Sequence, residues 1–266
     1  MRYTRAAGGR REPHTMNLMN APALVLVLSL VVLVCAAWAG DTLRARVSPL
    51  AEEERDDFNV LLSATLTLLG LLIGFSFSMA ISRYDQRKDY EEAEANAIGT
   101  EYLRADLLPA GDAPKVRELL KKYLDQRILF YTTRDLSRLA KVDADTAALQ
   151  NELWSAVRPA AAQPTAVFAL AISGMNDVLN SQGYTQAAWW NRIPTAAWAL
   201  MVIIAICCNL LIGYGLRQRD WRLFLILPVA VSIAFFLVSD IDSPRGGPIR
   251  VVPQNLMSLS QSLRTQ

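Results

Sequence analysis

The sequence is poor in the residues that most enzymes and metal sites use. It contains one histidine, His14, and three cysteines. A lone histidine removes the usual general base and a common metal ligand from most catalytic schemes. Cys35, Cys207 and Cys208 lie inside apolar runs without metal-ligand spacing, so we interpret them as small buried apolar residues. We therefore expect no metal and no cofactor.

Strong charge of one sign is also missing, because the net charge is only +2. Such a weak bias does not indicate a nucleic-acid partner. The chain has no serine–lysine or zinc-protease motif and no phosphate-binding glycine loop, so we do not expect an enzyme. Nor does an ionisable residue lie deep in an apolar run, which argues against a proton-coupled transporter.

Apolar residues, by contrast, are abundant: they form 52% of the chain, and the mean hydropathy is +0.20. A helix needs about twenty residues to cross the hydrocarbon layer of a bilayer. Four uncharged runs reach or approach this length, and tryptophans near their ends suit the headgroup region. The runs are 21–39, 58–82, 193–216 and 223–239, and the tryptophans are Trp38, Trp189, Trp190 and Trp221. We therefore predict four transmembrane helices and a lipid bilayer as partner.

The first run has an alternative interpretation. Ala37-Trp38-Ala39, followed by Gly40, is similar to a signal-peptidase site. We favour an ordinary first span because the run is longer than a typical signal-peptide core.

Between the second and third spans, the patterns are helical and no alternating strand pattern appears. Residues 115–142 have an amphipathic helix pattern, with Val116 and Leu120 on one side. Asp143 and Asp145 are candidate N-caps of a further helix ending at Pro159, followed by a linker at 159–164 and another helix over 164–180.

The predicted class is all-α, with a helical soluble domain between the second and third spans. The predicted organisation is a disordered leader at 1–20, spans one and two in 21–82, the soluble domain at 83–191, spans three and four in 192–240, and a C-terminal tail at 241–266.

The second span has two different sides. At about 100° per residue, its small and hydroxylated residues fall within about 80° of one another. These are Ser63, Thr67, Gly70, Gly74 and Ser78, whereas Leu62, Leu66, Leu69 and Ile73 occupy the opposite side. The common role of such a side is close helix packing through Gly70-x-x-x-Gly74, and the alternative is a pore wall.

Beyond Ser82 the same helix is predicted to continue into water without a break. Arg87 with Glu91, and Lys88 with Glu92, have the spacing of exposed pairs that solubilise a helix. An apolar side for packing follows at Ala95, Ile98, Tyr102 and Ala105, with Asn96 and Gly99 as a point of close contact.

Four stretches of the sequence, two of which overlap, carry a family resemblance. Residues 74–86 (GFSFSMAISRYDQ) resemble the end of the second transmembrane helix of bestrophins. The whole chain is similar to a bacterial family of uncharacterised integral membrane proteins called bestrophin-like. Its hallmarks correspond to 83–87 (RYDQR), 94–102 (EANAIGTEY) and 240–247 (DIDSPRGG).

The resemblance implies a pentameric channel for inorganic anions such as chloride, with the second helix around the pore. The hydrophobic neck of bestrophins corresponds to Thr67, Leu71 and Phe75, and Thr67 departs from the apolar pattern. The residues expected to line the pore are Ser63, Thr67, Gly70, Leu71, Gly74, Phe75 and Ser78. Those expected in the vestibule or at an interface are Arg83, Tyr84, Asp85 and Asn96.

The resemblance also bears on calcium gating and on the orientation of the chain in the membrane. Asp240 and Asp242 provide too few ligands for the calcium site of bestrophins, so we expect no calcium gating. The resemblance implies a multi-pass protein of the bacterial inner membrane with a cytoplasmic large domain, and the distribution of Lys and Arg agrees with this orientation by a narrow margin. The alternative function is a non-conducting scaffold or sensor whose helical domain binds a partner.

Overall fold

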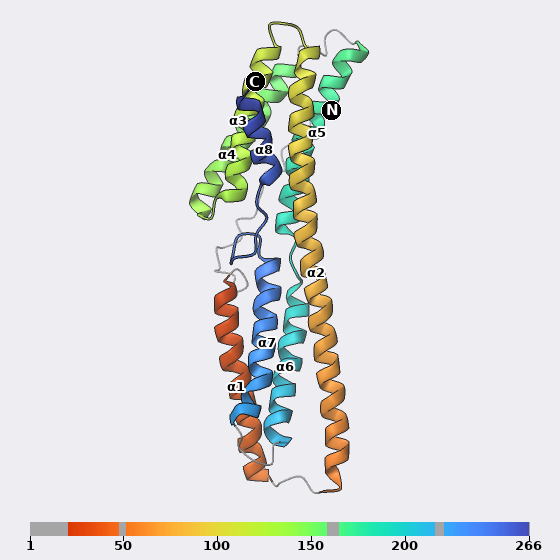
Figure 1. Ribbon diagram of the computed structural model, residues 1–266, viewed down its shortest axis with the longest axis vertical. Helices are drawn as coiled ribbons and strands as arrows, with labels where there is room; N and C mark the ends of the chain where they lie inside the picture. The colour runs from red at the N-terminus through yellow and green to blue at the C-terminus, as the bar shows by residue number, and fades with distance from the viewer. Residues whose placement is uncertain (1–20, 48–51, 159–164, 216–220, 266) are drawn as a thin grey trace. The chain divides into compact units, whose positions relative to one another are not determined.

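The computed structural model describes residues 21–47, 52–158, 165–215 and 221–265, and every regular element in these ranges is helical (Figure 1). The helices are α1 (Pro22–Val47), α2 (Glu54–Arg104), α3 (Ala113–Thr132), α4 (Leu136–Val157), α5 (Ala166–Trp190), α6 (Thr195–Gly215), α7 (Trp221–Asp242) and α8 (Gln254–Arg264), with a short 3₁₀ helix, η2 (Ala105–Leu107). Four of the described helices are long and apolar enough to cross a membrane. The all-α class is therefore confirmed.

The chain folds as two compact units. One, here the membrane unit, comprises Met1–Phe77 and Thr195–Pro248, and the other, here the head unit, comprises Ser78–Pro194 and Ile249–Gln266. The 51-residue helix α2 contributes to both, and no proline interrupts it. The head unit includes α8, which lies in the segment that the sequence analysis treated as a tail.

Within the membrane unit, α1 packs against α6 and α7 (Figure 1). The α1–α6 contact is so close that a β-carbon at Gly40 would overlap the carbonyl oxygen of Leu210, and one at Gly213 would overlap that of Ala37. Small residues at a helix crossing let two backbones approach in this way. The first apolar run is thus an integral helix of the bundle.

A tight turn follows α7. Gly247 has a φ of +48°, a left-handed conformation that glycine adopts without steric cost. The carboxylate of Asp240 occupies the place where a side chain at residue 247 would begin. The hydroxyl of Ser243 accepts a hydrogen bond from the Gly246 amide at 3.0 Å. The motif at 240–247 therefore comprises the last residues of α7 and a compact turn after them.

The head unit has one apolar core, to which α2, α3, α4, α5 and α8 contribute. The predicted apolar sides of α2 and α3 are both in it, with Ile98, Tyr102, Val116 and Leu120 buried. Trp189 also lies here, with its ring centroid 4.8 Å from that of Phe130. The expectation that Trp189 marks a membrane interface is therefore wrong, because the head core encloses it.

The boundary between α3 and α4 differs from the prediction. The amphipathic pattern over 115–142 is divided, because α3 ends at Thr132 and α4 begins at Leu136. The carboxylate of Asp135 accepts a hydrogen bond from the Ser137 amide at 2.9 Å and so caps α4. Asp143 and Asp145, predicted as caps, lie inside α4.

The remaining sequence-based expectations about the fold have different outcomes. The helix expected over 164–180 is α5, which extends to Trp190. The predicted leader at 1–20 and linker at 159–164 lie outside the described residues.

The three cysteines differ in burial. Cys208 is buried as predicted, whereas Cys35 and Cys207 are exposed on the outer sides of α1 and α6. The prediction that the chain buries its cysteines is therefore wrong for these two.

Two glycines provide a matched test of the membrane unit. We expect Gly213→Ala to destabilise the protein by about 1–3 kcal/mol, because its β-carbon would overlap the α1 backbone. Gly183→Ala on α5 is the control, since a β-carbon there meets nothing within 4 Å. Thermal unfolding in detergent measures both, and equal melting temperatures for the two variants would contradict the close α1–α6 contact.

Candidate functional site

The two sides of α2 differ in burial as sharply as they differ in composition. The buried side begins with Leu69, Ser76 and Ala80 and continues through Arg87, Glu91 and Glu94. The bulky residues Leu62, Leu66 and Ile73 are partly buried on the same side. The leucine-rich side of the second span therefore faces the rest of the chain.

The opposite side of α2 is open. All seven residues predicted to line a pore are exposed, including Phe75 at 63% and Leu71 at 52%. They are Ser63, Thr67, Gly70, Leu71, Gly74, Phe75 and Ser78. A β-carbon at Gly70 or Gly74 would meet nothing within 4 Å. The glycines therefore do not serve close packing against described helices of the same chain.

The threonine hydroxyls of this segment are bonded to their own helix. The hydroxyl of Thr67 donates to the Ser63 carbonyl at 2.8 Å, and that of Thr65 donates to the Leu61 carbonyl at 2.7 Å. Such bonds to the preceding turn are common for threonine in apolar surroundings. The hydroxyl proton of Thr67 is thereby occupied, which makes this position less polar than its residue type suggests.

The four residues predicted for a vestibule or an interface lie further along α2. Arg83 and Tyr84 are partly buried, whereas Asp85 and Asn96 are exposed. Tyr84 packs against the head core. Asn96 lines an open groove between α2 and α8, and Gly99 in the same groove faces Leu259, where a β-carbon would lie 3.2 Å from Cδ1. The structure thus brings Asn96 and Gly99 to one surface and buries much of Tyr84.

The charged residues after the membrane segment have a different role from the predicted one. Arg87 is buried and donates to the carbonyls of Ala188 and Asn191, both at 3.3 Å, at the end of α5. Glu91 is buried and accepts from the Asn255 amide group at 2.7 Å and from the Leu256 backbone N–H at 2.9 Å. The interpretation of Arg87 and Glu91 as exposed, solubilising residues is therefore wrong. They stabilise the C-terminus of α5 and the N-terminus of α8, where those charges are favourable.

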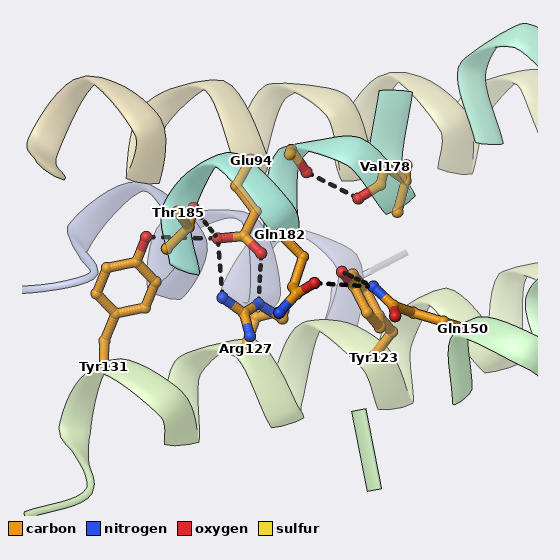
Figure 2. A network of polar contacts seen from close by, with 9 residues as sticks. Glu94, Tyr123, Arg127, Tyr131, Gln150, Val178, Gln182 and Thr185 are labelled. Atoms are coloured by element: carbon orange, nitrogen blue, oxygen red, sulfur yellow. Dashed lines mark hydrogen bonds and ion pairs between the residues drawn. The ribbon is translucent and has the colours of Figure 1, made fainter. Parts of the chain in front are cut away.

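Glu94 is the centre of a buried network that joins α2 to α3 and α5 (Figure 2). Its carboxylate pairs with Arg127 of α3, and both side chains are fully buried. Glu94 also accepts hydrogen bonds from the hydroxyl of Tyr131 at 3.4 Å and from that of Thr185 at 3.2 Å. Beside this group, Gln150 of α4 donates to the Tyr123 hydroxyl at 3.5 Å and to the Gln182 side chain at 3.4 Å. Four helices of the head unit therefore meet in one polar network.

The network stabilises the charged form of Arg127. Burial alone would lower the pKa of Arg127, but the Glu94 carboxylate and the nearby tyrosines raise it. The same burial, together with the Glu94 charge, raises the pKa of Tyr123 and of Tyr131. Arg127 is therefore charged, and Tyr123 and Tyr131 are neutral, over the whole physiological range.

Sequence reasoning missed the role of Glu94, although a signal was present. Glu94 lies on the same side of α2 as the apolar residues Ile98 and Tyr102, and so does Glu101 one heptad later. A charged residue within an apolar stripe indicates a buried partner, but the sequence does not identify Arg127 as that partner. Among the described residues, no three His, Cys, Asp or Glu side chains are grouped closely enough to hold a metal ion.

Two glutamate variants test the buried pair. Glu94→Gln leaves the Arg127 charge buried without compensation, and we expect a loss of about 3–5 kcal/mol in stability. Glu118→Gln is the control, because Glu118 forms an exposed pair with Lys122 on the same helix as Arg127. Thermal unfolding in detergent should show a large decrease for the first variant and almost none for the second. Equal melting temperatures would contradict the central role of Glu94.

Comparisons with known proteins agree with this architecture. Residues 23–256 match the Bestrophin-like domain. No curated protein matches the chain. The fold is similar to crystal structures of variants of a bacterial bestrophin homologue from Klebsiella pneumoniae. One has a TM-score of 0.64 at 13% identity, covering 92% of this chain and 98% of that chain. Another has a TM-score of 0.63 at 15% identity, covering 91% and 97%.

At these identities the structural similarity shows the fold alone, whereas the domain match covers most of the chain from α1 to the start of α8. The resemblance inferred from the four stretches of sequence is confirmed. This four-span, all-helical membrane protein belongs to the bestrophin-like family.

Proposed function

We propose that the protein is a homo-oligomeric channel for inorganic anions, with α2 of each copy surrounding a central pore. The observation that carries the proposal is the exposure of the small, hydroxyl-bearing side of α2 within its membrane segment. Its bulky side faces the remainder of the chain. The open side also carries bulky residues such as Leu61 and Leu68, so the proposal depends on the glycines and hydroxyl-bearing residues beside them, which lipid alone does not require.

The glycines support a shared axis of this kind. Gly70 and Gly74 have open space in front of them within their own chain. Only a second copy, or the water of a pore, gives such a surface a polar or closely packed environment inside a bilayer. The pentameric state comes from the family resemblance, and so does the choice of anions as the permeant species.

The neck of the proposed pore is formed by Thr67, Leu71 and Phe75. These residues are spaced by four along α2 and are all exposed on the same side. Rings of apolar side chains restrict conduction by excluding water from a narrow segment. Thr67 fits such a ring because its hydroxyl proton is bonded to the Ser63 carbonyl.

The remaining parts of the proposal concern location. The protein would lie in the bacterial inner membrane with the head unit in the cytoplasm, as the resemblance and the distribution of Lys and Arg favour. In this arrangement Arg83 and Asp85 would border the cytoplasmic vestibule. No catalytic step belongs to the proposed function.

Flux measurements with purified protein test the channel. We expect chloride flux into proteoliposomes from the unmodified protein, and a severalfold higher flux for Phe75→Ala and Leu71→Ala, because each removes bulk from the neck. Ile203→Ala is the control, since Ile203 is a similarly exposed apolar residue of α6 that lies outside the proposed pore.

Two results would overturn this function. One is an absence of flux from a correctly folded oligomer, and the other is a flux that Phe75→Ala and Leu71→Ala leave unchanged. A monomeric mass in detergent together with no flux would favour the non-conducting scaffold or sensor.

A further inference from the structure

Glu101 is the one acidic residue of the buried α2 stripe whose carboxylate lacks a hydrogen-bond partner among the described residues. Its exposed fraction is 0%, and neither oxygen has a hydrogen-bond partner. Glu91 and Glu94, on the same side of the same helix, are equally enclosed but have donors. An ionised carboxylate buried without donors is strongly unfavourable, so Glu101 cannot be explained as a third ion-pair anchor.

The carboxyl group of Glu101 is pressed against the backbone of α5. A β-carbon at Gly174 would overlap Glu101 Oε2, and it would lie 2.6 Å from Nη1 of Arg104. Residue 174 therefore admits only glycine while Glu101 keeps its position. The α2–α5 contact is thus closed on the side where the Glu101 carboxyl group meets Gly174.

The charges around Glu101 come from both packed helices. Arg104 lies one turn further along α2, and Asp177 lies on α5. Burial raises the pKa of Glu101 to about 8, Arg104 opposes that rise and Asp177 adds to it. A pKa near 8 favours the neutral acid at pH 7.

We propose that Glu101 is a proton sensor of the head unit: the neutral acid keeps α2 and α5 in contact at Gly174, and loss of its proton opens that contact. A charged carboxylate must obtain water or a donor. The Arg104 guanidinium lies nearby on α2 but makes no hydrogen bond to Glu101, and the Gly174 backbone closes the side toward α5, so separation of α5 from α2 would admit the water that the charge needs. Where α2 lines a pore, which rests on the function proposed above, the same step makes conduction sensitive to alkaline pH.

The sign of the effect on stability follows from proton linkage. The ordinary pKa of a glutamate is 4.5, and the folded protein holds the pKa of Glu101 near 8. Between these two values the folded state binds more protons than the unfolded state, so stability decreases as the pH rises. The destabilisation is complete above about pH 8.

Thermal unfolding of the full-length protein in detergent, from pH 5 to pH 9, tests the sensor. We expect the melting temperature of the unmodified protein to fall across this range, and Glu101→Gln to reduce the fall because its amide cannot ionise. Glu92→Gln is the matched control, an exposed glutamate on the same helix that should keep the fall unchanged. Should Glu101→Gln fail to fold, Glu101→Met replaces it.

Two neighbouring substitutions test whether the charges around Glu101 set the pH at which the fall ends. Burial is the main cause of the raised pKa, and Asp177→Asn removes a charge that adds to it, so the upper end of the fall should move to lower pH. Arg104→Gln removes a charge that lowers the pKa of Glu101, so the upper end of the fall should move to higher pH. The sensor is excluded if the melting temperatures of both variants fall over the same pH range as that of the unmodified protein. It is also excluded if the melting temperature of Glu101→Gln falls as far as that of the unmodified protein.

Hydrogen exchange and flux complete the design. Exchange in α5 around Gly174, corrected for its intrinsic pH dependence, should increase above pH 8 in the unmodified protein and not in Glu101→Gln. No increase in the unmodified protein would overturn the opening of the α2–α5 contact. Both stability and exchange are independent of conduction, so a protein without flux would refute the channel and leave these two tests decisive for the sensor.

Discussion

The constraint on which the head unit depends is that a charge removed from water must find a partner. Arg87, Glu91 and Glu94 are three charged side chains on the inward side of one helix, and all are buried. Each contacts a different partner: the carbonyls at the end of α5, the first turn of α8, and Arg127 of α3. Since an unpaired buried charge costs several kcal/mol, each of these helices is held in one register against α2.

The opposite side of α2 is not covered by the other described parts of the chain. In the membrane segment this surface carries small and hydroxylated residues, together with exposed apolar residues such as Leu61, Leu68 and Phe75. A single helix therefore carries a fixed side, anchored by leucines and then by buried charges, and an open side. Such a division suits an element that joins a membrane-spanning bundle to a helical head, because anchoring and function do not compete for the same residues.

Much of the fold could be predicted because hydrophobicity and helical period act locally along the chain. The apolar runs predicted the four spans, and the two sides of α2 were visible from a spacing of 3.6 residues per turn. Local patterns gave wrong predictions where a partner distant in the sequence determines whether a side chain is buried. Arg87 and Glu91 have the spacing of an exposed pair, yet each is buried against a residue about a hundred or more positions away. The Asp135 cap was missed because the apolar pattern continues across the α3–α4 boundary.

The sequence by itself determined the membrane spans, the helical class, the family and the asymmetry of the second span, since composition and period are enough to specify these. Only the tertiary structure decided which glutamates are anchored and which is not. Glu91, Glu94 and Glu101 are identical in residue type and share one side of α2. The positions of Leu256, Arg127 and Gly174 in the folded chain give two of them donors and leave the third against a bare backbone.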